Sequence, residues 1–231
     1  MSALAGSFPQ ESPGLPRGRG RIDPDDVRAA QRPRILRAAI TAFAERGFHA
    51  TTVADIVTRA RVSRAAFYAQ FGTKEDCFIA AVDSGRTTLM PKIAEATTRA
   101  WPQGFATAIG ATVREYLRVC ASEPEFTRAW TLEFPHAGPT AVRIRNEYFD
   151  TLAATLRAAH LAHVADTDLP HRPLGPPNYL ALIGGCHELF YRHVAANRTD
   201  RLPDLEPAMT QFLLDALTHT PVPRRRPGPD P

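Results

Sequence analysis

The sequence is poor in several residue types, and each scarcity excludes a class of protein. It has 231 residues with three cysteines and, among 28 basic residues, two lysines, Lys74 and Lys92. Three distant cysteines without a CxxC pair argue against a disulfide scaffold or a zinc ribbon and favour a reducing compartment. No run of about 18 apolar residues is present, and no basic segment followed by an apolar one opens the chain. A cytoplasmic location is therefore expected.

The charge of the chain is unevenly distributed. The formal net charge is +4 and the sequence pI is about 9.2. Residues 1–80 hold twelve basic and eight acidic side chains, whereas residues 81–231 hold sixteen of each. Because the excess lies entirely in the first third, that part is the expected site for a polyanionic partner.

The two ends of the chain lack a hydrophobic period. Residues 1–25 are rich in proline, glycine and serine, and residues 221–231 are similar, so a disordered arm and a disordered tail are predicted. The arm carries three arginines within residues 17–21. Such a run is either a solvated tail or an arm that lies in a DNA minor groove, and both interpretations stay open.

Between the two ends the pattern is helical, with no alternating strand and no Asn-Gly or Asp-Gly hairpin turn. An apolar helix ends at Gly47, and Thr52 and Ser63 are expected to cap short helices over 52–60 and 64–71. Thr73 is expected to cap a further helix. Prolines then separate the helices expected over 92–100, 103–121, 124–134, 138–163, 177–198 and 204–219. The predicted fold is all-α.

Two short helices joined by the turn 61–63 predict a helix-turn-helix, whose second helix reads the DNA major groove. Arg64 can bind guanine or phosphate, Ala65 a thymine methyl, and Tyr68 a phosphate. Lys74 lies in the first turn of the next helix, where a cation is unfavourable for the helix dipole. This cost is explained if Lys74 binds a phosphate. The expected DNA contacts are Thr51, Thr52, Ser63, Arg64, Ala65, Ala66, Tyr68, Gln70 and Lys74.

Residues 33–82 resemble the TetR family of bacterial transcriptional regulators. The resemblance rests on ILRAA at 35–39, FAERGF at 43–48, TTVADI at 51–56, VSRAAFYAQF at 62–71 and TKED at 73–76. Gln70 stands where the family often has histidine, and it can still donate to a phosphate. The resemblance implies a three-helix DNA-binding domain over 26–80, a long fourth helix as connector, and an all-helical regulatory and dimerisation domain over 81–220.

The resemblance also implies a ligand pocket and a dimer interface in the second domain. Aromatic residues proposed to line an apolar pocket are Phe105, Tyr116, Trp130, Phe134 and Phe149. The helices over 138–163 and 177–198 are the expected dimer surface, with Leu152, Leu156, Leu180, Gly184, His187, Tyr191 and Val194 as candidates. Two adjacent glycines, Gly184 and Gly185, indicate close packing, either across the dimer or within the chain.

The function expected from these features is a homodimeric repressor that binds a palindromic operator and is released by a small apolar ligand. An activator or a ligand-independent regulator is the alternative, and a helical carrier or enzyme without DNA binding is a remote one. No catalytic residues, cofactor or metal are expected. His187 and Glu188 begin an HExxH pattern, but Tyr191 replaces the second histidine, and His160 and His163 lack a third ligand.

Overall fold

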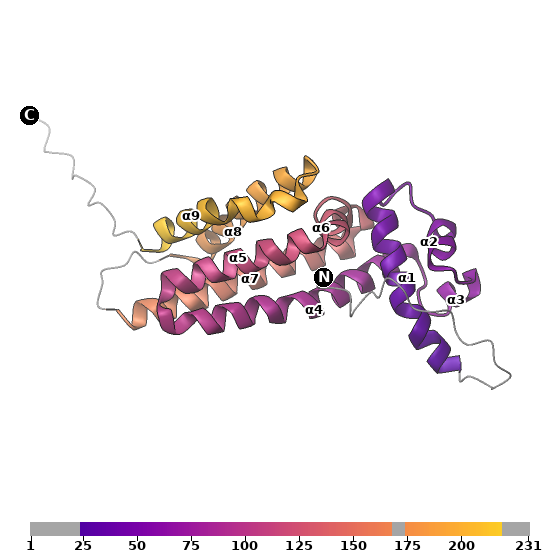
Figure 1. Cartoon of the computed structure of the whole chain (residues 1–231), viewed down its shortest axis with the longest axis horizontal. Helices are drawn as coiled ribbons and strands as arrows, with labels where there is room; N and C mark the ends of the chain where they lie inside the picture. The colour runs from indigo at the N-terminus through magenta and orange to yellow at the C-terminus, as the bar shows by residue number, and fades with distance from the viewer. Residues whose placement is uncertain (1–23, 168–173, 219–231) are drawn as a thin grey trace, which may run out of the picture.

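The computed structural model describes residues 24–167 and 174–218, and no strand occurs in these two ranges. Helices α1, α2 and α3 and the start of α4 form a compact head at one end of the elongated molecule, and α4 extends from the head into the body (Figure 1). The four helices are α1 (Pro24–Arg46), α2 (Val53–Ala60), α3 (Arg64–Tyr68) and α4 (Lys74–Ala100). The all-α fold and the N-terminal helix-turn-helix are thereby confirmed.

The rest of the described chain forms an elongated helical body. Helices α4, α5 and α7 run lengthwise beside one another, and α8 and α9 cover a further side (Figure 1). The elements after α4 are η1 (Trp101–Gln103), α5 (Phe105–Ser122), α6 (Pro124–Arg128), η2 (Ala129–Glu133), η3 (Phe134–Ala137), α7 (Pro139–Ala165), α8 (Pro176–Ala195), η4 (Thr199–Leu205) and α9 (Glu206–Thr218).

Aromatic side chains fasten the head to the start of α4. Phe43 of α1 stacks on Phe78 of α4 with ring centroids 4.3 Å apart, and Phe78 meets Phe134 of η3 edge to face at 5.1 Å. All three rings are fully buried. Aromatic contacts of this kind add to the free energy gained by burying their area. One apolar core therefore runs from the head into the adjoining part of the body.

The separate helix predicted over 92–100 is wrong, because α4 continues through Pro91 from Lys74 to Ala100. A proline inside a helix removes a backbone hydrogen bond and costs about 3 kcal/mol. Leu89 and Ile93, on either side of Pro91, are both buried, and α5 packs along α4. This burial offsets the cost and keeps the helix continuous.

The single helix predicted over 124–134 is three short elements. After α6 the backbone widens into the π-helical turn η2 and then tightens into the 3₁₀ turn η3. The predicted arm (1–25), with its arginines at 17–21, and the predicted tail (221–231) fall outside the described residues, apart from the start of α1. Among the described helices, none is long and apolar enough to cross a bilayer.

Candidate DNA interface and ligand cavity

Helix α2 is fixed at its start by a reciprocal capping box. The Asp55 backbone N–H donates to Thr52 Oγ1 at 3.2 Å, and the Thr52 N–H donates to Asp55 Oδ2 at 2.8 Å. These hydrogen bonds from Thr52 hold the pKa of the Asp55 carboxyl below its usual range, and Arg46, 2.6 Å away, adds to the effect. The hydroxyl of Thr52 also donates a hydrogen bond to Asp55 Oδ2 at 2.7 Å.

The turn between α2 and α3 is held by a residue that the sequence analysis did not single out. Arg61 caps α2 in the left-handed conformation, with φ 53°. Arg34 of α1 donates to the carbonyl oxygen of Ala60 at 2.6 Å and to that of Arg61 at 3.3 Å. Arg34 thus fixes α2 and the turn against α1. The sequence did not predict this role, because Arg34 is 26 residues away from Ala60 along the chain.

Helix α3 has one buried face and one face open to solvent. Ser63 caps it by accepting a hydrogen bond from the Ala66 N–H at 3.0 Å. Phe67 is fully buried, whereas Tyr68 is 56% exposed, and Arg64 and Ala65 are exposed as well. The side chains expected to read DNA therefore lie together on the outer face, while Ala66 is half-buried beneath them.

Two expected DNA contacts are turned inward. Thr51 is 0% exposed, and its hydroxyl donates to the carbonyl oxygens of Gly47 at 2.8 Å and Ala42 at 3.1 Å. The amide nitrogen of Gln70 is buried and has no hydrogen-bond partner among the described residues. Neither group presents a donor to the surface, so both expectations are corrected: Thr51 holds the loop before α2 in place, and the amide nitrogen of the half-buried Gln70 is turned inward.

Lys74 is held by the protein itself. Its ammonium donates to the carbonyl oxygens of Phe48 at 2.8 Å and Thr51 at 2.9 Å, and it lies over the Phe48 ring at 4.3 Å from the centroid. Two of its three N–H donors are used in this way. Lys74 therefore joins the loop 47–52 to α4, and contact with a phosphate through the third donor stays a prediction.

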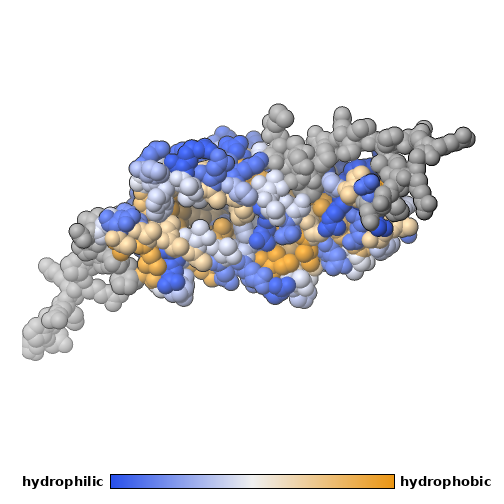
Figure 2. Space-filling model, turned by 90° about the horizontal axis from the view of Figure 1, so that it is seen from below, coloured by the Kyte–Doolittle hydropathy of each residue, from blue (hydrophilic) through white to orange (hydrophobic). Residues whose placement is uncertain are grey.

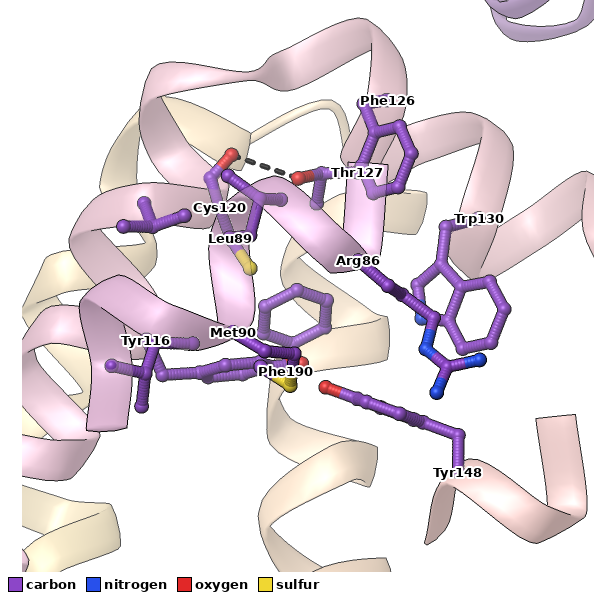
Figure 3. A pocket seen from close by; sticks show the side chains of 12 residues that line it. Arg86, Leu89, Met90, Tyr116, Cys120, Phe126, Thr127, Trp130, Tyr148 and Phe190 are labelled. Atoms are coloured by element: carbon purple, nitrogen blue, oxygen red, sulfur yellow. Dashed lines mark hydrogen bonds between the residues drawn. The ribbon is translucent and has the colours of Figure 1, made fainter. Parts of the chain in front are cut away.

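A small apolar cavity of about 40 Å³ lies in the helical body (Figure 3). Helices α4, α5, α7 and α8 and the α6–η2 segment (residues 124–133) surround it. Its lining includes Leu89, Tyr116, Cys120, Phe126, Trp130 and Tyr148. Burial raises the pKa of the Cys120 thiol to about 12 and the pKa of each tyrosine hydroxyl well above its usual value. These three groups are therefore neutral near pH 7.

Among the described residues that line the cavity, Arg86 of α4 is the one basic side chain, and no acidic side chain accompanies it. Its side chain reaches toward Trp130 and Tyr148 (Figure 3), and its guanidinium carbon lies 5.4 Å from the Tyr148 ring centroid. The Nε of Arg86 is buried and has no hydrogen-bond partner in the part of the chain that the structure describes. A buried donor without an acceptor is costly, which makes this nitrogen notable.

Two of the five aromatic residues expected at the pocket, Tyr116 and Trp130, line the cavity. The other three do not, which corrects those expectations. Phe105 stacks on His163 at 4.4 Å, and Phe149 meets His187 edge to face at 4.7 Å. Phe134 belongs to the core that joins head and body. Aromatic composition does not fix which way a ring points, and the periodicity of one helix cannot supply that information.

The α6–η2 segment, which lines the cavity, also bonds to the head. Glu133 Oε2 accepts from the Phe48 N–H at 2.9 Å, and Arg128 Nε donates to the Ala44 carbonyl oxygen at 3.0 Å. The Thr41 hydroxyl donates to Glu125 at 2.7 Å. Residues 126, 127 and 130 of the same segment face the cavity. The cavity and the head therefore share one wall.

The expected dimer residues are divided between interior and surface. Leu156 and Val194 are buried within the protomer, so they are corrected to core positions. Leu180, Gly184 and Tyr191 are exposed, and Leu152 and His187 are half-buried. Burial, together with a smaller effect of the nearby Arg145, lowers the pKa of His187 to about 4.

The glycine pair of α8 is explained in part by contacts within the chain. A Cβ on Gly185 would lie 3.0 Å from the Phe212 ring of α9, whereas a Cβ on Gly184 would meet nothing within 4 Å. Gly185 therefore permits an intramolecular helix crossing, and Gly184 faces open space.

In the view from below, apolar residues form separate patches among hydrophilic ones (Figure 2).

Comparison with known proteins agrees with this geometry. Residues 35–81 match the family model of the bacterial regulatory proteins of the tetR family. No curated protein matches the chain. Seventy-five chains of solved structures match it, and in the three described below the likeness spans most of both chains.

Two of these structures are named FadR. The fatty acid degradation regulator FadR from Bacillus halodurans is 20% identical, with 82% of this chain and 97% of that one covered and a TM-score of 0.69. The transcriptional regulator FadR from Bacillus subtilis, in complex with stearoyl-CoA, is 17% identical, with 79% and 97% covered and a TM-score of 0.70.

A TetR-family transcriptional regulator from Streptomyces coelicolor is 18% identical, with 87% and 98% covered and a TM-score of 0.60. At these identities the structures show a common fold, whereas the family match falls on the helix-turn-helix and its supporting helices. Residues 35–81 therefore match the DNA-binding part of the tetR family, and the described chain shares its fold with these transcriptional regulators.

Proposed function

We propose that the chain is a homodimeric repressor that binds a palindromic operator through α3, with residues 26–80 reading DNA and residues 81–220 regulating it. The observation that carries this proposal is the outer face of α3. Arg64, Ala65 and Tyr68 are exposed together, while Phe67 on the opposite side anchors the helix in the core. An exposed arginine and tyrosine beside a small apolar residue suit base edges and phosphates in a major groove.

A second copy of the chain is the proposed partner of α8, one of the two helices expected at the dimer surface, together with the exposed Phe212 of α9 beside it. Leu180 and Tyr191 on α8 are each 41% exposed, and Phe212 on α9 is 43% exposed. Gly184, with open space where a Cβ would stand, lets another backbone approach closely. Pairing this surface with its own copy about a two-fold axis buries these side chains and presents two heads to a palindrome.

The expected ligand is a small molecule with an apolar chain. The FadR structure from Bacillus subtilis contains stearoyl-CoA, and the cavity of this chain is lined mainly by apolar side chains. Ligand sites usually occupy about 300–1,000 Å³. Because the present cavity is about 40 Å³, a ligand must widen it, and Phe126 and Trp130 are among the residues that must move.

Widening the cavity is the step that we connect to release from DNA. Phe126 and Trp130 belong to the α6–η2 segment, whose Arg128 and Glu133 hold the head at Ala44 and Phe48. A ligand that binds the widened form better shifts the equilibrium toward it. In that form the head and the first part of α4 rotate, and the two reading helices no longer match the half-site spacing.

The same architecture also suits an activator, or a regulator that needs no ligand, and a transcriptional reporter distinguishes these from a repressor. Repression predicts higher expression when the gene for this chain is deleted, whereas activation predicts lower expression. As a regulator of chromosomal genes in a bacterium, the protein is proposed to act in the cytoplasm.

Gel-shift titration on the DNA upstream of the chain's own gene tests the proposal. Arg64→Ala and Tyr68→Ala are each expected to weaken binding by about 1–3 kcal/mol, which is roughly 5- to 150-fold. Both side chains are exposed, so the fold should be kept. Arg99→Ala, an exposed arginine at the far end of α4, is the matched control and should bind as wild type does. If Arg64→Ala and Tyr68→Ala both bound the DNA as tightly as the wild type does, the proposal would be refuted.

A further inference from the structure

Arg86 lies between the cavity and a groove on the surface. The groove has a volume of about 500 Å³ and is bounded by α1, α4 and α7. Arg86 lines both spaces, so its guanidinium stands where a molecule entering the apolar cavity would leave its polar end. No other residue in the described ranges lines both spaces.

The surroundings of Arg86 lack an acceptor for its buried N–H. The Nε has no hydrogen-bond partner among the described residues, and no ion pair of Arg86 within 4.0 Å is found there. Its neighbours in the cavity are the Tyr148 ring and other mainly apolar groups. A guanidinium presents N–H groups that match the two oxygens of a carboxylate. This arrangement fits an acceptor that arrives with a ligand.

The groove indicates how much negative charge that ligand carries. Besides Arg86, its charged side chains are Arg32, Asp76, Asp83 and Glu147. Three carboxylates against two guanidiniums give no excess of positive charge to a polyanionic group such as a nucleotide phosphate chain. A single carboxylate does not need such an excess of positive charge, because the guanidinium of Arg86 alone neutralises it.

We infer that the cavity binds an apolar chain ending in one carboxylate, and that Arg86 recognises this carboxylate. This inference rests on the proposed function, because it names the ligand class of the same site. It differs from a CoA thioester, whose phosphates would have to lie along the acidic groove. Arg86 is thereby the residue that determines specificity for the free acid.

Trp130 allows ligand binding to be measured in the absence of DNA. The chain has two tryptophans, and only Trp130 lines the cavity. In a Trp101→Phe background, Trp130 fluorescence reports binding directly. The probes are decanoate, 1-decanol and decanoyl-CoA, which share one chain length and differ in the charge of the head group.

Decanoate is expected to bind at least tenfold more tightly than either other probe, and Arg86→Gln is expected to abolish this preference. Arg145→Gln is the matched control, because Arg145 also lies over an aromatic ring, that of Phe149, but does not line the cavity. Thermal unfolding checks that Arg86→Gln remains folded. If Arg86→Gln unfolds, Arg86→Lys must keep a weakened preference for the acid.

Four results would overturn the inference. They are equal binding of acid and alcohol, tighter binding of decanoyl-CoA than of decanoate, an unchanged acid preference in Arg86→Gln, and binding of none of the probes. Each result leaves the gel-shift outcome untouched, so failure of this inference and failure of DNA binding are distinguishable.

Discussion

Lys74 shows how one side chain determines the geometry of the DNA-binding head. Its ammonium joins α4 to the loop before α2 through the carbonyl oxygens of Phe48 and Thr51. A lysine in the first turn of a helix opposes the helix dipole. Two charge-assisted hydrogen bonds and the Phe48 ring offset that cost. The residue therefore contributes to stability whether or not DNA is present.

Replacing Lys74 with methionine is expected to lower the free energy of unfolding by about 2 kcal/mol, because two carbonyl oxygens lose a charged donor. Urea unfolding of the DNA-free protein measures this change. Lys92→Met makes the same replacement in α4 outside the head and serves as the comparison. Unchanged stability with weaker DNA binding would instead assign Lys74 to phosphate contact alone.

Local residue patterns predicted the helix caps correctly, but they did not predict which neighbour is buried. The caps Thr52, Ser63 and Thr73 are all found, since a cap depends on residues three positions away. Thr51 and Thr52 are chemically alike, and only the tertiary fold turns the first inward. The contact of Arg34 with residues 60 and 61 joins positions that no short spacing connects.

At the scale of elements, the crossing of α4 with the α6–η2 segment depends on one glycine. An ideal Cβ on Gly85 would lie 2.2 Å from the Phe126 ring, closer than real atoms approach. Phe126 also lines the cavity. The missing side chain at Gly85 thus leaves room for a ring that forms part of the cavity wall.

Gly85→Ala is expected to lower the free energy of unfolding by about 1–3 kcal/mol, the usual cost of overpacking a core. Thermal unfolding measures it, and Phe126→Leu in the same chain should restore part of the loss by removing the clash. Gly110→Ala, whose Cβ would make only ordinary contacts from 3.6 Å, is the control. A Gly85→Ala protein as stable as wild type would contradict the described crossing.

Most helices are predictable from the sequence because their apolar periods are long and their caps are local. The exceptions are elements whose form depends on neighbours. Pro91 would end an isolated helix, yet burial of the residues around it keeps α4 whole. The π-helical turn η2 leaves no separate mark in the sequence, although such turns are frequent at functional sites.

At the scale of the whole molecule, the excess positive charge and the helix-turn-helix belong to the same part of the chain. The formal excess of positive charge lies within residues 1–80, and the helix-turn-helix lies at one end of an elongated body. Phosphate contacts by such a head release counterions, so DNA binding should weaken steeply as salt is raised. The cavity adjoins this end, which places ligand binding next to DNA reading.

The most direct test of the central claim, a dimer that reads DNA through α3, is a hydroxyl-radical footprint on the operator found by gel shift. Two protected half-sites are expected on one face of the duplex, with centres about one helical turn or a multiple of it apart. Arg64→Ala should weaken protection of both half-sites equally, because each protomer contributes one copy of α3. A single protected site, or protection unchanged by that substitution, would contradict the account.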